Sequence, residues 1–175
     1  MAKKFLSFFY FAISIMILIA ILKVANYLPM ALQKDTMREY KSIEEVKSKL
    51  NINDVYVPSY FPQGLVWPPS TVLAQEKPFV AIILEFKRAG KGDIALIISQ
   101  SASAAFAPDE KIKILHINER VNYPFKGRNM TVEAGLCKAE EPCSKIAWDE
   151  GKYRINITAK STSPALMQIA ESMIK

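Results

Sequence analysis

The chain has few of the residues that most enzymes and metalloproteins need. Its 175 residues include one histidine, His116, and two cysteines, Cys137 and Cys143. A tetrahedral site built from Cys and His needs four ligands, so these three residues cannot form one. No Gly-x-Ser-x-Gly or His-Glu-x-x-His motif is present, and Glu119 lies three residues from His116, on the opposite face of a strand. We therefore expect no enzymatic activity and no cofactor.

The sequence also lacks a strong excess of one charge. It contains 23 Lys and Arg against 17 Asp and Glu, a net charge of +6. Because Lys3, Lys4 and Lys23 flank one apolar run, about half of that excess belongs to this run alone. The remaining field is weak, which argues against a dedicated nucleic-acid binder.

Charge, proline and glycine are all absent from residues 5–22, which read FLSFFYFAISIMILIAIL. As a helix these 18 residues would span roughly 27 Å, close to the thickness of a bilayer core. A cleaved signal peptide is the main alternative, but its apolar region is usually about 7–15 residues long. No small-residue cleavage site follows Lys23, so residues 1–23 are predicted to form an uncleaved signal-anchor.

The orientation of this anchor depends on opposing features. Lys3, Lys4 and the amino terminus favour a cytoplasmic N-terminus, whereas several cations between residues 23 and 41 favour the reverse. Long domains are translocated largely regardless of charge, and a cysteine pair suits an oxidising compartment. We expect a single-pass protein of the cell membrane whose body lies in the periplasm or outside the cell.

Residues 24–41 are interpreted as a connector and residues 42–175 as an extracytoplasmic domain. Ser42 and Glu45 form a capping-box pattern, which predicts a helix over residues 43–50. Ser163 and Pro164 have the N-cap and first-turn chemistry of a second, C-terminal helix. Leu166, Ile169, Ala170 and Met173 share one face of that helix.

Between these helices the pattern is that of strands. Residues 79–86 and 94–98 are two apolar runs around a charged, Gly-rich turn, which predicts a hairpin buried on both faces. Further strands are predicted at 112–117, 130–134, 146–148 and 153–159. The expected fold class is α+β: one antiparallel sheet of five to seven strands, with a helix before it and a C-terminal helix packed on it.

Two cysteines with five intervening residues predict a disulfide in an exported protein. A bond between Cys137 and Cys143 would close a small loop between two strands. Free thiols remain the alternative, since a redox-active pair more typically has two intervening residues.

Aromatic rings and prolines alternate in the segment 54–69, which holds four of the ten prolines. It is predicted to begin as a short edge strand and to continue as a rigid, irregular stretch. Tyr56, Tyr60, Phe61 and Trp67 either cap the core of their own domain or form a contact surface for a partner.

Residues 57–64, VPSYFPQG, resemble the V-P-x-Y-L-P-x-G opening of an uncharacterised bacterial extracytoplasmic domain. That domain follows the membrane anchor of sporulation-related and anti-sigma-factor-like proteins. The resemblance extends over residues 55–175 through the central hairpin, Trp148, Gly151, Tyr153 and the final I-A-E-S. It implies an α+β domain with a membrane-tethered sensing or interaction role. Because only four residues precede the apolar run, we expect no sigma-binding segment before it.

The function expected from these features is that of a non-catalytic, membrane-anchored accessory or assembly subunit acting by protein–protein interaction. Its expected partners are the membrane and a protein of a membrane or periplasmic complex, with no nucleic acid. The alternative is a tethered periplasmic domain that binds a ligand or lipid, or acts as a sensor.

Overall fold

The computed structural model describes residues 13–23, 37–108 and 111–174, in two compact units with a boundary between Met37 and Arg38. In the first unit, residues 13–23 form a helix with exposed side chains. Within the described ranges, no helix combines the length and hydropathy that crossing a membrane requires. Residues 5–12 of the predicted anchor and 24–36 of the predicted connector lie outside those ranges.

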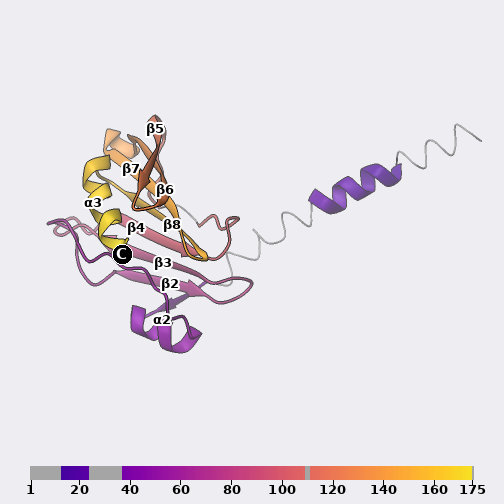
Figure 1. Cartoon of the computed structure of the whole chain (residues 1–175), viewed down its shortest axis with the longest axis horizontal. Coiled ribbons are helices and arrows are strands. Elements are labelled where there is room, and N and C mark those ends of the chain that lie inside the picture. Colours follow the sequence, from indigo (N-terminus) through magenta and orange to yellow (C-terminus); the bar gives the residue numbers. More distant parts are fainter. Residues whose placement is uncertain (1–12, 24–36, 109–110, 175) are drawn as a thin grey trace, which may run out of the picture. The chain divides into compact units, whose positions relative to one another are not determined.

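The second unit contains one antiparallel sheet of eight strands in the order β1-β2-β3-β4-β8-β7-β6-β5 (Figure 1). The strands are β1 (Arg38–Tyr40), β2 (Thr71–Gln75), β3 (Ala81–Lys87), β4 (Ile94–Ser101), β5 (His116–Phe125), β6 (Arg128–Leu136), β7 (Pro142–Glu150) and β8 (Tyr153–Ala159). The α+β class is confirmed, and the expectation of five to seven strands is wrong.

The sequence pattern missed β1 and β2. β1 has three residues, too few to display an alternation, and it pairs with β2, so the compact unit starts at Arg38 rather than at residue 42. The edge strand predicted near residues 54–57 is not formed; this segment is irregular backbone. The amide of Tyr56 donates to the side chain of Gln100 instead of to a neighbouring strand, and Pro58, which follows, has no amide donor.

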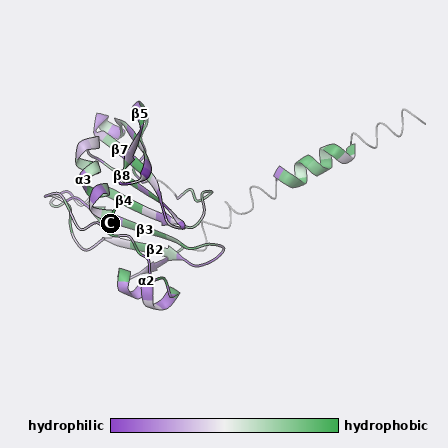
Figure 2. Cartoon of the chain, in the orientation of Figure 1, coloured by the Kyte–Doolittle hydropathy of each residue, from purple (hydrophilic) through white to green (hydrophobic). Residues whose placement is uncertain are grey.

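The β3–β4 hairpin is buried on both faces, as predicted. One face contributes Leu84, Phe86 and Ile98 to the main core, and the other contributes Ile83 and Ile97. Figure 2 shows hydrophobic residues along these two central strands. A hairpin buried in this way needs a cover on each side, and different parts of the chain supply the two covers.

Helix α2 (Ile43–Leu50) packs beside β1 and β2, and its Ile43 and Val46 are buried. The Ser42 side chain accepts a hydrogen bond from the amide of Glu45 at 3.2 Å, which confirms the predicted cap. A capping box also predicts a hydrogen bond from the amide of Ser42 to the carboxylate of Glu45. This part of the prediction is wrong, because the carboxylate accepts from the amide of Lys41 instead.

Helix α3 (Ser163–Met173) lies against β6, β7 and β8. Its buried residues are the four predicted: Leu166, Ile169, Ala170 and Met173. The N-cap is Thr162 rather than Ser163, and Pro164 lies in the first turn. This helix and the irregular segment after α2 cover one face of the sheet.

The strand predicted at residues 112–117 is displaced toward the C-terminus. Ile112 is buried as part of a covering segment, and β5 begins only at His116. Gly135 of β6 explains how β5 can begin so close to β6. A Cβ at this position would lie 1.9 Å from the carbonyl oxygen of His116. Glycine lets the β5 backbone approach β6 at this point.

Candidate functional site

The predicted contact segment divides between core and surface. The Phe61 ring lies 5.0 Å from that of Trp67 and 5.2 Å from that of Phe86, a residue of the main core. Trp67 also stacks on Phe86 at 6.1 Å, yet 53% of its surface is exposed. Phe61 and Trp67 therefore close the core at this end of β3, and Trp67 keeps an outer face.

The two tyrosines of the segment lie apart from this cluster. Tyr56 packs edge-on against Tyr153 at 6.3 Å, and its amide donates to the side chain of Gln100 at 3.0 Å. Burial raises the pKa of the Tyr56 hydroxyl. Tyr60 is 43% exposed, and its amide donates to the Ser172 side chain of α3 at 3.2 Å. Of the four predicted residues, Tyr60 and Trp67 thus keep large exposed surfaces, whereas Tyr56 and Phe61 pack against residues of the sheet.

A partly buried ion pair lies near Tyr56. Arg128 donates two hydrogen bonds to the Glu150 carboxylate, at 2.8 and 2.6 Å, a bidentate pairing between β6 and β7. The indole N–H of buried Trp148 donates to the same carboxylate at 3.3 Å. The hydrogen bonds from Arg128 lower the pKa of Glu150, although burial acts in the opposite direction.

Cys137 and Cys143 form the predicted disulfide, with an S–S distance of 2.04 Å. It joins the end of β6 to the start of β7 across the short helical turn η1 (Lys138–Glu140). The amide of Cys137 also donates to the carbonyl of Glu141 at 2.9 Å, so the loop is closed by a covalent bond and a backbone bond.

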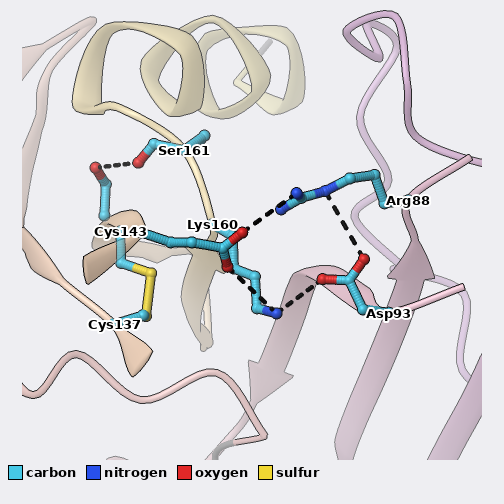
Figure 3. Close-up of a disulfide and its surroundings, with 8 residues drawn as sticks. Arg88, Asp93, Cys137, Cys143, Lys160 and Ser161 are labelled. Carbon is cyan, nitrogen blue, oxygen red and sulfur yellow. Dashed lines mark hydrogen bonds and ion pairs between the residues drawn. A yellow bond between two sulfur atoms is a disulfide. The ribbon is translucent and has the colours of Figure 1, made fainter. Parts of the chain in front are cut away.

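A charged cluster lies beside the disulfide (Figure 3). Lys160 donates to Asp93 at 2.8 Å and lies 3.6 Å from Glu141, and Arg88 lies 3.4 Å from Glu141. The hydrogen bond from Lys160 lowers the pKa of Asp93. The cluster connects the β3–β4 turn, the disulfide loop and the end of β8. Its two cations and two carboxylates balance in charge, which indicates a structural role.

The edge of the sheet formed by β5 is much more open. β5 is the last strand in the order and pairs with β6 alone among the described strands. Nine of its ten residues are exposed, including Ile117 at 47%, Val121 at 44% and Tyr123 at 45%. An edge strand of this length with apolar side chains presents unpaired backbone groups to another chain. At the opposite edge β1 has only three residues.

Two features limit the accessible part of the β5 edge. The register with β6 shifts between Ile117 and Glu119, which marks a bulge, and Pro124 lacks an amide donor near the other end. The regular stretch between them is Glu119–Tyr123. Five residues are about the length of an average strand, so this stretch is long enough to pair with one.

A shallow groove of about 280 Å³ runs between this stretch and α3. Val121 and Tyr123 of β5, Val132 of β6 and Met167 of α3 are among its lining residues. The Tyr123 ring stacks on that of Phe125 at 6.3 Å, which extends the apolar surface toward the core. Side chains from a strand added to β5 would meet an apolar floor here.

In the described part of the chain, no group of three or more His, Cys, Asp or Glu residues is arranged to hold a metal ion. His116 is exposed at the start of β5, and Glu119 lies beyond the bulge. The β5 edge is the feature that sequence reasoning missed; its signal is the alternation of Val121 and Tyr123 with polar residues.

Comparisons of the chain with models of protein families, with curated proteins and with solved structures found no match. A function for this chain is therefore inferred from its own surfaces. The resemblance over residues 55–175 stays a prediction.

Proposed function

We propose that the protein is a non-catalytic, membrane-anchored extracytoplasmic accessory subunit that binds a partner protein through the edge of β5. The partner contributes an extended segment that pairs with Glu119–Tyr123 and lays alternate side chains into the groove beside α3. The 18-residue uncharged run over residues 5–22 supports the anchor, and the disulfide supports an oxidising location.

The observation that carries this proposal is the exposure of β5 along nearly its whole length. Strand addition to such an edge combines backbone hydrogen bonds for affinity with side-chain pockets for specificity. Val121 and Tyr123 supply the apolar contacts, and Arg120 on the other face forms an ion pair with Glu133.

The aromatic segment 56–67 is a weaker candidate for the same role. Its Phe61 ring packs against Phe86 in the core, and its Tyr56 ring packs against Tyr153. Of its four predicted aromatic residues, only Tyr60 and Trp67 keep large exposed surfaces. These two residues are the second place to look for the partner.

Substitution Val121→Lys tests the proposal. A lysine on the groove side of the edge strand would place a charge where an apolar side chain of the partner docks, which is how natural edge strands avoid pairing. The native complex, extracted in mild detergent and sized, should fall toward the 19.7 kDa of the single chain. Because Val121 is already 44% exposed, the melting temperature should hardly change.

Asn122→Lys is the matched control, since it adds the same charge one residue away on the opposite face of β5. This variant should keep the size of the wild-type complex. If both variants keep it, or both lose it to the same extent, the groove side of β5 is not the contact surface.

A further inference from the structure

Among the described residues that line the groove beside β5, one is charged. Glu119, Val121 and Tyr123 alternate along β5 and line the groove, so they lie on the same face of the strand. The rest of the lining is uncharged and consists of Val132 and Ala134 of β6 and Ser163, Pro164 and Met167 of α3. The groove is therefore mostly apolar, with a carboxylate where the regular stretch of β5 begins.

The carboxylate of Glu119 has no cation beside it. Within the described ranges, its exposed side chain forms no ion pair. The next residue, Arg120, points to the other face of β5 and pairs there with Glu133, which lies directly opposite in the ladder. By contrast, each carboxylate of β6 and β7 pairs with an arginine: Glu133 with Arg120, Asp149 with Arg154 and Glu150 with Arg128.

A strand that docks on β5 changes the surroundings of Glu119. In the free chain water solvates this carboxylate, and docking removes part of that water, so a charge left without a partner would cost free energy. Side chains directly opposite each other on paired antiparallel strands have Cβ atoms about 4.5–5.5 Å apart, where opposite charges stabilise the pairing and like charges destabilise it. The partner residue opposite Glu119 therefore affects which segments can bind.

We infer that the partner segment carries a lysine or an arginine opposite Glu119 and apolar side chains opposite Val121 and Tyr123. This inference rests on the strand pairing proposed above. Every pair of neighbouring strands described in the sheet is antiparallel, and an antiparallel partner would run from Tyr123 toward Glu119. Read from its N-terminus, its pattern is apolar-x-apolar-x-basic.

A second copy of β5 fits this requirement poorly. If two copies of the regular stretch pair in antiparallel fashion about Val121, Glu119 of each copy lies opposite Tyr123 of the other. Arg120 then lies opposite Asn122, on the face away from the groove. No cation reaches Glu119 in this arrangement, so the inferred occupant is a basic and apolar segment of a different protein.

Two synthetic peptides test the inferred charge. The full chain in phosphatidylcholine nanodiscs is titrated into dye-labelled TVTVTKT or TVTVTET, and binding is measured by fluorescence anisotropy. In both peptides the valines match Val121 and Tyr123, and the charged residue matches Glu119. The lysine peptide should bind about fivefold more tightly than the glutamate peptide, because one makes an opposite-charge pair and the other a like-charge pair. This preference should shrink in about 1 M NaCl.

Charge reversal on the protein gives the matched test. Glu119→Lys should invert the preference, so that the glutamate peptide binds more tightly. Because Glu119 is exposed, the melting temperature should hardly change. Glu39→Lys makes the same change of charge on β1, at the other edge of the sheet, and should leave the preference as in the wild type.

The outcomes separate this inference from the proposed function. Val121→Lys should abolish binding of both peptides. If both peptides bind equally well to wild type and to Glu119→Lys, yet Val121→Lys abolishes binding, strand pairing on β5 stands and the requirement for a cation is wrong. If neither peptide binds to wild type, or Val121→Lys leaves binding intact, the proposed pairing itself is wrong.

Discussion

Among single residues, Glu150 shows how hydrogen bonds stabilise a partly buried carboxylate beside the core. Its carboxylate accepts two bonds from Arg128 and one from Trp148, so three donors on two strands converge on one side chain. These contacts favour the ionised form, which is why the pKa of Glu150 is lowered from 4.5.

The lowered pKa predicts a pH-dependent contribution to stability. A carboxyl group whose pKa is depressed in the folded chain stabilises it fully above the unfolded value, near 4.5. That contribution disappears as the pH falls through the lower, folded value. Glu150→Gln should therefore lower the melting temperature clearly at about pH 7 and much less at about pH 3.

Asp149→Asn provides the comparison for this prediction. Asp149 is the neighbouring carboxylate, it is 71% exposed, and its substitution should have little effect at either pH. A difference between wild type and Glu150→Gln that stays constant across the pH range would show that the ion pair with Arg128 contributes no titrating stability.

At the scale of elements, α3 carries the clearest prediction. Ile169→Asp would bury a carboxylate in the core, at a position 2% exposed, at a cost of several kcal/mol. The melting temperature should fall by more than about 10 °C. Gln168→Asp introduces the same side chain one residue earlier, on the exposed face, and should change it by only a few degrees. Similar shifts for the two variants would mean that the buried face of α3 is assigned incorrectly.

The elements also show what sequence patterns can predict. α3 and the β3–β4 hairpin carry their signal in long runs of regularly spaced apolar residues, and both were predicted with their buried faces. β1 and β2 carry no such signal: β1 has three residues, and β2 has five and begins two residues after Pro69. Their place in the sheet is fixed by pairing: β2 pairs with β3, and β1 pairs with β2. This information comes from residues distant in the sequence.

The candidate site was harder to predict for the same reason. Aromatic rings near prolines predicted a contact surface at residues 56–67. In the structure, however, Phe61 packs on Phe86 and Tyr56 packs on Tyr153. The exposed edge of β5 depends on its place at the end of the strand order, and strand order cannot be read from local spacing. The disulfide was predictable because only two cysteines are available to pair.

For the whole molecule, the covered and the open parts of one sheet are distinct. The disulfide, the ion pairs beside it and the two covered faces of β3 and β4 hold the fold together. The edge strand β5 is exposed along nearly its whole length, so a partner strand can pair there without disturbing the core.

Site-specific photo-cross-linking in intact cells tests the partner surface most directly. A benzophenone amino acid at position 123, on β5, should give one discrete heavier adduct, and the same amino acid at position 91 should give none. Introducing Val121→Lys should abolish the adduct at position 123. If position 123 gives no adduct while positions 60 or 67 do, the partner binds the aromatic segment, and the assignment of β5 as the contact surface is wrong.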